Sequence, residues 1–415
     1  MLTGSLNCSL RTSINQKMRG ALGVKMTHRK AEALRRLASG LFISATTTLL
    51  AVLAVEVSMR VVLPADFMDA GQFKGLMMKD AGLGWKPRPN LAMTWTSRYG
   101  STTLATNADG LMPASATRTR LRGVTRILLL GDSTVMGKSV PESARLHRQL
   151  QEQLGRAGMP AEVINAAAEG WATDQSLLRL IELIDLYRPD MVIYGFCLND
   201  LHGNTTGFDN ASKPRFVMEV SGALRLIPAD DRPLEDHAAN ILYRYSAAYR
   251  YFQPTIFAIR AKLGLVSDSA AFAPEPFWTD DAFLDSRDWR LFWRLLVEIR
   301  NRAAARQIAF LFYAHPSAEE VWPPSIKSHL HQLGHAPERH DPYRVERRLA
   351  AGAVEAGVSF VPMVNYFRER TSEGPFHLLP RDPHSNHVGY GLIAAKLSEA
   401  ITREAQLSPA AVLPR

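Results

Sequence analysis

The stretch RILLLGDSTVMG, from Arg126 to Gly137, constrains the fold of this chain most. Four consecutive apolar residues, Ile127 to Leu130, run directly into Gly131-Asp132-Ser133. A short apolar run that ends at glycine is typical of a strand covered on both faces, as in a parallel sheet. Ser133 would then lie at the carboxyl end of that strand, which is the edge where open α/β sheets bind ligands. Backbone N–H groups at a turn from strand to helix can also stabilise an anion.

The chain after residue 126 alternates short apolar runs with amphipathic runs. We expect further strands at 163–167, 191–196, 308–313 and 358–361. We expect helices at about 142–157, 173–187, 287–305, 342–356 and 388–403, with Thr173 or Asp174 as the N-cap of the second. The apolar residues of 287–305 recur at the i, i+3, i+4, i+7 spacing of one helical face. Strands that alternate with helices indicate βαβ units, so the sequence predicts an α/β fold with a parallel sheet.

Two segments do not follow this alternation. Residues 60–125 contain scattered prolines and a short alternating run at 91–96 that predicts a strand. We interpret them as a stalk, or N-terminal extension, that folds back onto the following domain. In the second segment, residues 201–285, the runs 216–220 and 223–227 around Ser221-Gly222 predict a β-hairpin. We expect this segment to be an insertion that caps the site; a structural excursion without substrate contact is the alternative. Aromatic residues follow the hairpin at Tyr243, Tyr245, Tyr249, Tyr251 and Phe252.

The N-terminal region has the pattern of a membrane anchor. Residues 37–55 are uncharged, and 19 helical residues span about 28 Å, close to the hydrocarbon thickness of a bilayer. Residues 1–36 hold eight basic residues and one acidic residue. The positive-inside rule places such a flank in the cytoplasm. We expect a mostly disordered, basic cytoplasmic tail at 1–36, an inner-membrane anchor at 37–59, and the rest of the chain in the periplasm or outside the cell.

Two other interpretations of residues 37–55 are a cleaved signal peptide and a buried helix of a soluble protein. Cleavage is disfavoured because Glu56 follows directly and no A-x-A site stands there. The tail carries seven of the nine net positive charges, so the remaining chain has no basic face for nucleic acid. Cys8 and Cys197 would lie on opposite sides of the membrane and could not form a disulfide.

Ser133 is a candidate nucleophile, and a serine hydroxyl needs a base to take its proton. Asp382-Pro383-His384 can supply that base, with Asp382 orienting the imidazole of His384. Val135 stands two residues after Ser133, so the G-x-S-x-G nucleophile elbow does not apply. A metal site at Asp382, His384 and His387 is the alternative. The looser group His329, His331, His335 and His340 has no clear ligand spacing.

The order of these blocks resembles the SGNH (GDSL) hydrolase family, in its membrane-anchored bacterial form. The serine comes early, Asn199 follows the apolar run 191–196, and D-P-H-S-N-H-V-G-Y occupies Asp382 to Tyr390 before the last helix. The resemblance implies a flavodoxin-like three-layer α/β/α domain at 126–405. It also implies an oxyanion hole formed by the N–H groups of Ser133 and Gly170 and the side chain of Asn199. Cys197 stands where the family motif G-x-N-D has glycine.

The same resemblance implies an enzyme that cleaves carboxylic esters through Ser133, His384 and Asp382, with no cofactor and no metal. Together with the expected outward location, it favours small O-acyl groups, such as acetyl, on envelope glycans or lipids. Envelope polysaccharide machinery is the candidate protein partner. The alternatives are an O-acyltransferase to a sugar, a catalytically silent glycan-binding or assembly subunit, and a soluble cytoplasmic esterase.

Overall fold

The computed structural model describes residues 6–62, 75–97, 99–205, 213–229, 246–249, 251–252, 259, 284–322, 338, 340–378 and 384–407. The chain divides into two compact units. The first comprises Met1–Leu63 and Ser246–Tyr251, and the second comprises Pro64–Tyr245 and Phe252–Arg415.

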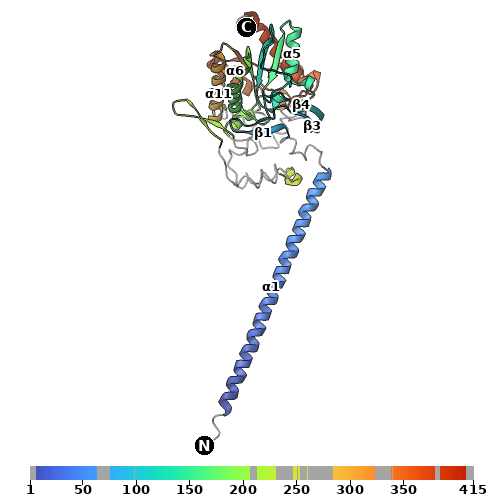
Figure 1. Cartoon of the computed structure of the whole chain (residues 1–415), viewed down its shortest axis with the longest axis vertical. Helices are drawn as coiled ribbons and strands as arrows, with labels where there is room; N and C mark the ends of the chain where they lie inside the picture. The colour runs from blue at the N-terminus through green and yellow to red at the C-terminus, as the bar shows by residue number, and fades with distance from the viewer. Residues whose placement is uncertain are drawn as a thin grey trace. The chain divides into compact units, whose positions relative to one another are not determined.

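The first unit is built on α1 (Leu6–Val62), one continuous helix of 57 residues (Figure 1). Its segment Glu32–Val62 is long and apolar enough to cross a membrane, and none of its most apolar window is buried in protein. Leu41 and Phe42, for example, are 63% and 73% exposed. A helix of a soluble domain buries its apolar side chains, so α1 is a candidate anchor; a signal sequence would have the same features.

The helix also includes most of the tail for which the sequence predicts disorder. Residues 6–36 are helical, and no proline occurs before Pro64. Leucine, alanine, lysine and arginine are frequent in this stretch, and all four have high helix propensity. Apolar periodicity did not predict this helix because residues 6–36 contain no apolar stripe at helical spacing. Only the helix propensity of these residues indicates it.

The second unit contains a sheet of five parallel strands. These are β5 (Thr125–Leu130), β6 (Ala161–Asn165), β7 (Met191–Phe196), β10 (Ala309–Ala314) and β11 (Ser359–Val361). Their order in the sheet is β6-β5-β7-β10-β11, which confirms the predicted flavodoxin-like arrangement. The chain reverses its direction of progress across the sheet between β5 and β7. The carboxyl ends of these two strands therefore flank the crevice where such sheets bind ligands.

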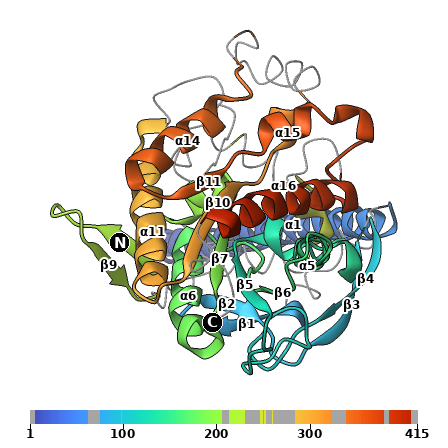
Figure 2. The same ribbon diagram turned by 90° about the horizontal axis from the view of Figure 1, so that it is seen from above.

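Helices cover both faces of the sheet (Figure 2). One face packs on α5 (Leu146–Arg156) and α16 (His387–Leu407), and the other on α6 (Thr173–Tyr187), α11 (Arg287–Ala304) and α14 (Arg344–Ala356). Ile127 and Leu129 belong to the first apolar core, whereas Leu128 and Leu130 belong to the second. Every residue of β5 is buried, as expected for a strand covered on both faces. The three-layer α/β/α fold is thus confirmed.

The segment before β5 forms two antiparallel pairs, β1 (Met77–Asp80) with β2 (Gly84–Pro87), and β3 (Ala92–Ser97) with β4 (Gly100–Ala105). Leu76, Leu83 and Leu104 are buried in the apolar core shared with α5 and α16. The Trp85 indole N–H donates to the carbonyl of Glu169 at 2.7 Å. This extension therefore packs next to the loop that carries Gly170.

Within the insertion, β8 (Arg215–Met218) and β9 (Leu224–Ile227) form the predicted antiparallel hairpin. Gly222 lies in its turn with φ of 80°. Most of the remaining insertion, including Tyr243 and Tyr245, lies outside the described residues, so a cap over the site stays a prediction. His329, His331 and His335 also lie outside them.

Candidate active site

Ser133 is the first residue of α4 (Ser133–Met136), directly after β5. Gly131 lets the strand enter this turn, with φ of 151°. A Cβ atom on Gly131 would lie 2.4 Å from Val135 Cγ2 and 2.9 Å from the carbonyl oxygen of Gly195. No side chain fits there, so glycine is required where β5 and β7 approach each other.

The buried side chain of Asp132 is the N-cap of α4. Its Oδ1 accepts hydrogen bonds from the Thr134 N–H at 2.8 Å and from the Thr134 hydroxyl at 2.6 Å. Asn165 Nδ2 donates to the Val135 carbonyl at 2.9 Å, and the Tyr390 hydroxyl donates to the Thr134 carbonyl at 2.8 Å. Strand β6 and helix α16 therefore both hold the turn that presents Ser133.

His384 lies beside this serine, although 251 positions separate the two residues. Its Nε2 is 2.8 Å from Ser133 Oγ. That distance is suited to proton transfer from a serine hydroxyl to an imidazole. Asp382 lies outside the described residues, so its hydrogen bond to His384 stays a prediction. His387 is exposed at the start of α16. Within the described part of the chain, no three His, Cys, Asp or Glu residues could hold a metal ion.

The loop that carries His384 is fixed by three neighbours. The Leu378 N–H donates to the His384 carbonyl at 2.9 Å. Ser385 Oγ lies 3.0 Å from Nε2 of His315, which directly follows β10. Asn386 Oδ1 accepts the N–H of Val388 at 2.9 Å, in the first turn of α16. The loop is thus tied to the sheet edge and to the final helix.

The residues expected to form the oxyanion hole lie at the same edge of the sheet. Asn199 begins α7 (Asn199–Gly203), after β7, and its Nδ2 donates to Asp132 Oδ2 at 3.2 Å. An amide carries two N–H donors, and the second has no acceptor among the described residues. Gly170 follows β6 in a left-handed conformation, with φ of 68°. Among the described residues, no acceptor takes the Gly170 N–H.

Cys197, at the motif's glycine position, keeps the local turn intact. Its N–H donates to Asp200 Oδ2 at 3.0 Å, and the Asp200 N–H donates back to the Cys197 carbonyl at 2.9 Å. Burial, together with the charges of Asp132 and Asp200, raises the pKa of the Cys197 thiol well above its usual range. A thiol of this kind is a small buried side chain and not a second nucleophile.

The sequence reasoning did not identify the buried acidic residues around this site. Burial raises the pKa of Asp132, while hydrogen bonds from Thr134 and the charge of His384 oppose the rise. Burial and the charge of Asp132 raise the pKa of Asp200 well above its usual range. Asp200 is part of the Asn199-Asp200 pair, so the motif offered a signal for it. Asp174 and its partner Lys213 offered none, because they are 39 positions apart.

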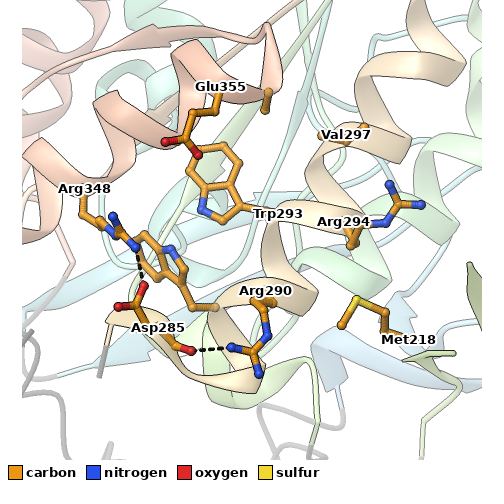
Figure 3. Close-up of a pocket in the computed structure, with 11 residues that line it drawn as sticks. Met218, Asp285, Arg290, Trp293, Arg294, Val297, Arg348 and Glu355 are labelled. Carbon is orange, nitrogen blue, oxygen red and sulfur yellow. Dashed lines mark hydrogen bonds and ion pairs between the residues drawn. The ribbon is translucent and has the colours of Figure 1, made fainter. Parts of the chain in front are cut away.

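A separate cavity of about 450 Å³ lies between α11 and α14 (Figure 3). None of the predicted site residues lines it. The Trp293 indole fills the space above Gly352, where a Cβ atom would lie 2.3 Å from the ring. Asp285 accepts a hydrogen bond from Arg290 on its carbonyl at 2.7 Å and pairs with Arg348 through its carboxylate.

No protein-family model matches the chain. A stretch of 104 residues, 24% of this chain, is 32% identical to an arylesterase from Vibrio mimicus and spans 50% of that protein. The esterase EstA from Pseudoalteromonas sp. superposes with a TM-score of 0.34 and 11% identity, covering 68% of this chain and 99% of that chain. The acetyl xylan esterase AlAXEase superposes with a TM-score of 0.35 and 13% identity, covering 66% of this chain and 98% of that chain. A GDSL-like lipase from Bacteroides thetaiotaomicron superposes with a TM-score of 0.33 and 13% identity, covering 70% of this chain and 93% of that chain.

Superpositions with such low TM-scores carry no argument, and the likeness to a known family rests on this chain's own features. Gly-Asp-Ser follows the first strand of the sheet, Asn199-Asp200 follows the third, and His384 precedes the last helix. The sheet has the expected order, and the serine and histidine are in hydrogen-bonding contact. The partial match to an arylesterase agrees with these observations. The second unit therefore has a flavodoxin-like α/β/α fold and an order of motifs that resembles the SGNH (GDSL) hydrolase family.

Proposed function

We propose that this protein is a carboxylic ester hydrolase with Ser133 as its nucleophile. The distance of 2.8 Å between Ser133 Oγ and His384 Nε2 carries the proposal. A serine at a structural turn has no need of an imidazole from the other end of the domain. A nucleophile within hydrogen-bonding reach of its base is the arrangement that acyl transfer requires. The same contact disfavours a catalytically silent subunit.

In the proposed reaction, Ser133 Oγ attacks the ester carbonyl carbon and its proton passes to His384 Nε2. The carbonyl oxygen becomes an oxyanion, stabilised by the N–H groups of Ser133 and Gly170 and by the second N–H of Asn199. The tetrahedral intermediate then collapses. The alcohol leaves with the proton from His384, and an acyl-serine remains. Water attacks this ester with His384 as the base, and the acid is released. Asp382 is assigned the role of orienting His384.

We further propose small O-acyl esters, such as acetyl groups on envelope glycans or lipids, as the substrates. Ser133 is only 7% exposed, which favours a short acyl chain. The exposed apolar surface of α1 supports anchoring in the inner membrane, and the basic flank before it supports a cytoplasmic N-terminus. The catalytic domain would then act on the outer side of that membrane.

The test uses the full-length chain in detergent micelles and a fluorophosphonate probe, which reacts with activated serines. The wild-type protein should label, and Ser133→Ala should not. Ser176→Ala is a matched control, because Ser176 is also buried but lies in α6 with no role in the reaction. Labelled wild type and Ser176→Ala, with an unlabelled Ser133→Ala, support the proposal. A folded wild-type protein that does not label contradicts it, and so does labelling that survives Ser133→Ala.

Turnover of p-nitrophenyl esters of increasing chain length tests the preference for short acyl groups. We expect kcat/KM to fall from acetate to octanoate. A preference for octanoate would contradict the proposed substrate class while leaving the role of Ser133 intact.

A further inference from the structure

A buried ion pair lies beside the oxyanion-binding elements and has no part in the reaction above. Lys213 Nζ is 2.6 Å from Asp174 Oδ1 and 2.7 Å from Oδ2. The two side chains are 4% and 0% exposed. Asp174 lies in the first turn of α6, and Lys213 shortly precedes β8. Desolvating a buried ion pair often costs more free energy than the attraction between its charges provides. The pair is therefore weak evidence of a role in stability, and its location is the informative feature.

The pair is joined to one end of α7 through Asn204. The Asp174 N–H donates to Asn204 Oδ1 at 3.0 Å. The Asn204 N–H in turn donates to the Asp200 carbonyl at 2.9 Å, which closes the C-terminal end of α7. Asn199, the oxyanion donor, is the first residue of this same short helix. Movement at Asp174 would therefore be transmitted to the helix that carries the donor.

The other end of α7 is joined to α6 through Tyr194. The Tyr194 hydroxyl donates to Asp200 Oδ2 at 2.5 Å and lies 2.9 Å from Thr173 Oγ1. Thr173 immediately precedes Asp174 and comes three residues after Gly170, the second expected donor. The N-terminus of α6 thus connects both ends of α7 with the Gly170 loop.

Three carboxyl groups are completely or almost completely buried in this region: Asp132, Asp174 and Asp200. Asp200 lies close enough to the other two for their charges to repel its own. Among the described residues, Lys213 is the cation that faces Asp174 and Asp200, and Arg215 stands two residues further along the chain. Removing the lysine charge would leave Asp174 uncompensated beside Asp200. Relaxation of that repulsion would displace the N-terminus of α6 and α7.

We propose that Lys213 is a positioning residue for the oxyanion hole: by neutralising Asp174, it holds the N-terminus of α6 and helix α7, and with them Gly170 and Asn199, in place. This inference rests on the proposed esterase function. It assigns a catalytic effect to a lysine of the insertion that contacts neither the nucleophile nor its base.

The test compares Lys213→Met with the double variant Asp174→Asn/Lys213→Met, each as the full chain in micelles. The readout is the second-order rate constant of fluorophosphonate labelling, corrected for the folded fraction. Lys213→Met should label on the order of 10-fold more slowly or worse, short of the roughly 100- to 1000-fold loss of removing a donor outright. The double variant buries no net charge and keeps the side-chain volumes, so it should label within roughly threefold of wild type.

A purely structural role for Lys213 predicts a different pattern, because both variants lose the same ammonium group. The double variant would then label as slowly as Lys213→Met. That result overturns the proposal, and so does a folded Lys213→Met that labels at the wild-type rate. If Lys213→Met alone does not fold, the double variant decides: labelling close to wild type supports the proposal, and a tenfold loss overturns it.

Arg126→Met is the matched control for the loss of a buried cation. Arg126 is 1% exposed and pairs with Glu162 at 2.7 Å, at the amino end of β5, away from Ser133. This variant should lower the midpoint of urea unfolding but leave the labelling rate of the folded protein unchanged. The wild-type protein is measured in the same series. If it does not label, the proposed function itself fails; if it labels and the Lys213 variants do not behave as expected, only the inference fails.

Discussion

Replacing Asn199 by alanine tests whether its amide is an oxyanion donor. One N–H of this amide is used on Asp132 Oδ2 at 3.2 Å, and the proposed reaction uses the other. Loss of one such donor typically slows the chemical step by about 100- to 1000-fold, equivalent to about 2.7–4 kcal/mol. The N–H groups of Ser133 and Gly170 remain in the variant. We therefore expect a loss of about 100-fold in kcat, at the lower end of that range.

The same substitution has a second, separable effect on stability. Asp132 is 0% exposed, and Asn199→Ala removes the partner of its Oδ2 while both bonds from Thr134 to Oδ1 remain. A buried acceptor left without a partner costs about 1–3 kcal/mol. The free energy of unfolding should fall by that amount, measured by urea titration of the full chain in micelles. The rate and the stability are compared on the same preparation.

Asn107→Ala is the control, because Asn107 is another buried asparagine and lies away from the site. Its Nδ2 donates to the Ala116 carbonyl and to the Tyr187 hydroxyl, both at 2.8 Å. This variant should lose a similar amount of stability and keep the wild-type rate of p-nitrophenyl acetate hydrolysis. If folded Asn199→Ala stays within about threefold of the wild-type rate, or if Asn107→Ala slows as much, the assignment of the donor is wrong.

Three further predictions concern stability. Burial lowers the pKa of His147 in the folded protein below its usual 6.5. At pH values below 6.5, the unfolded chain therefore binds more protons at His147 than the folded protein does. The free energy of unfolding should therefore fall as the pH drops from 7 towards 5, with a smaller fall in His147→Gln; equal pH profiles from urea titrations would contradict this. Gly352→Ala places a methyl group on the Trp293 ring and should cost about 1–3 kcal/mol by thermal unfolding while leaving probe labelling intact. Gly131→Ala forces Val135 and the turn before Ser133 to move, so it should lose both stability and labelling; a variant that labels normally would contradict the packing described.

The sheet and its helices could be predicted because their patterns are local. The apolar run 191–196 and the helical run 173–187 coincide with β7 and α6, residue for residue. Each is long enough for its period to be recognised, and each is bounded by a breaker or a polar residue. β6 lies two residues earlier than expected, at 161–165, because its pairing with β5 runs from Ala161 opposite Thr125 to Asn165 opposite Leu129. The pairing register, which one sequence does not reveal, fixes that boundary.

The extension before the domain was harder to predict because its strands are defined by their partners. β1 and β2 have four residues each, and β4 is the polar run GSTTLA. No period can be recognised in four residues. The buried Trp85 of β2 donates its indole N–H to the Glu169 carbonyl in the Gly170 loop, far away in the sequence. Such contacts leave no local signal.

The site residues also divide into those that a local motif identifies and those that depend on contacts distant in the sequence. Ser133 and His384 could be named because each sits in a motif beside a recognisable element. The expected N-cap of α6 illustrates what a motif cannot settle. Ala172 occupies the cap position, and the carboxylate of Asp174, a plausible cap by local rules, pairs with Lys213 instead. This carboxylate also accepts the N–H of its neighbour Gln175 at 2.8 Å, so it joins a buried ion pair to a local hydrogen bond without capping the helix.

Helix α16 contacts both the turn that presents the serine and the loop that carries its base. Tyr390, in its first turns, donates to the carbonyl of Thr134 in the serine turn. Asn386, immediately before the helix, fixes the loop that carries His384. Both contacts belong to one helix packed against α5 and the sheet, so nucleophile and base are held by a single rigid element. The contact between Ser133 and His384 therefore depends on the packing of α16 in this core.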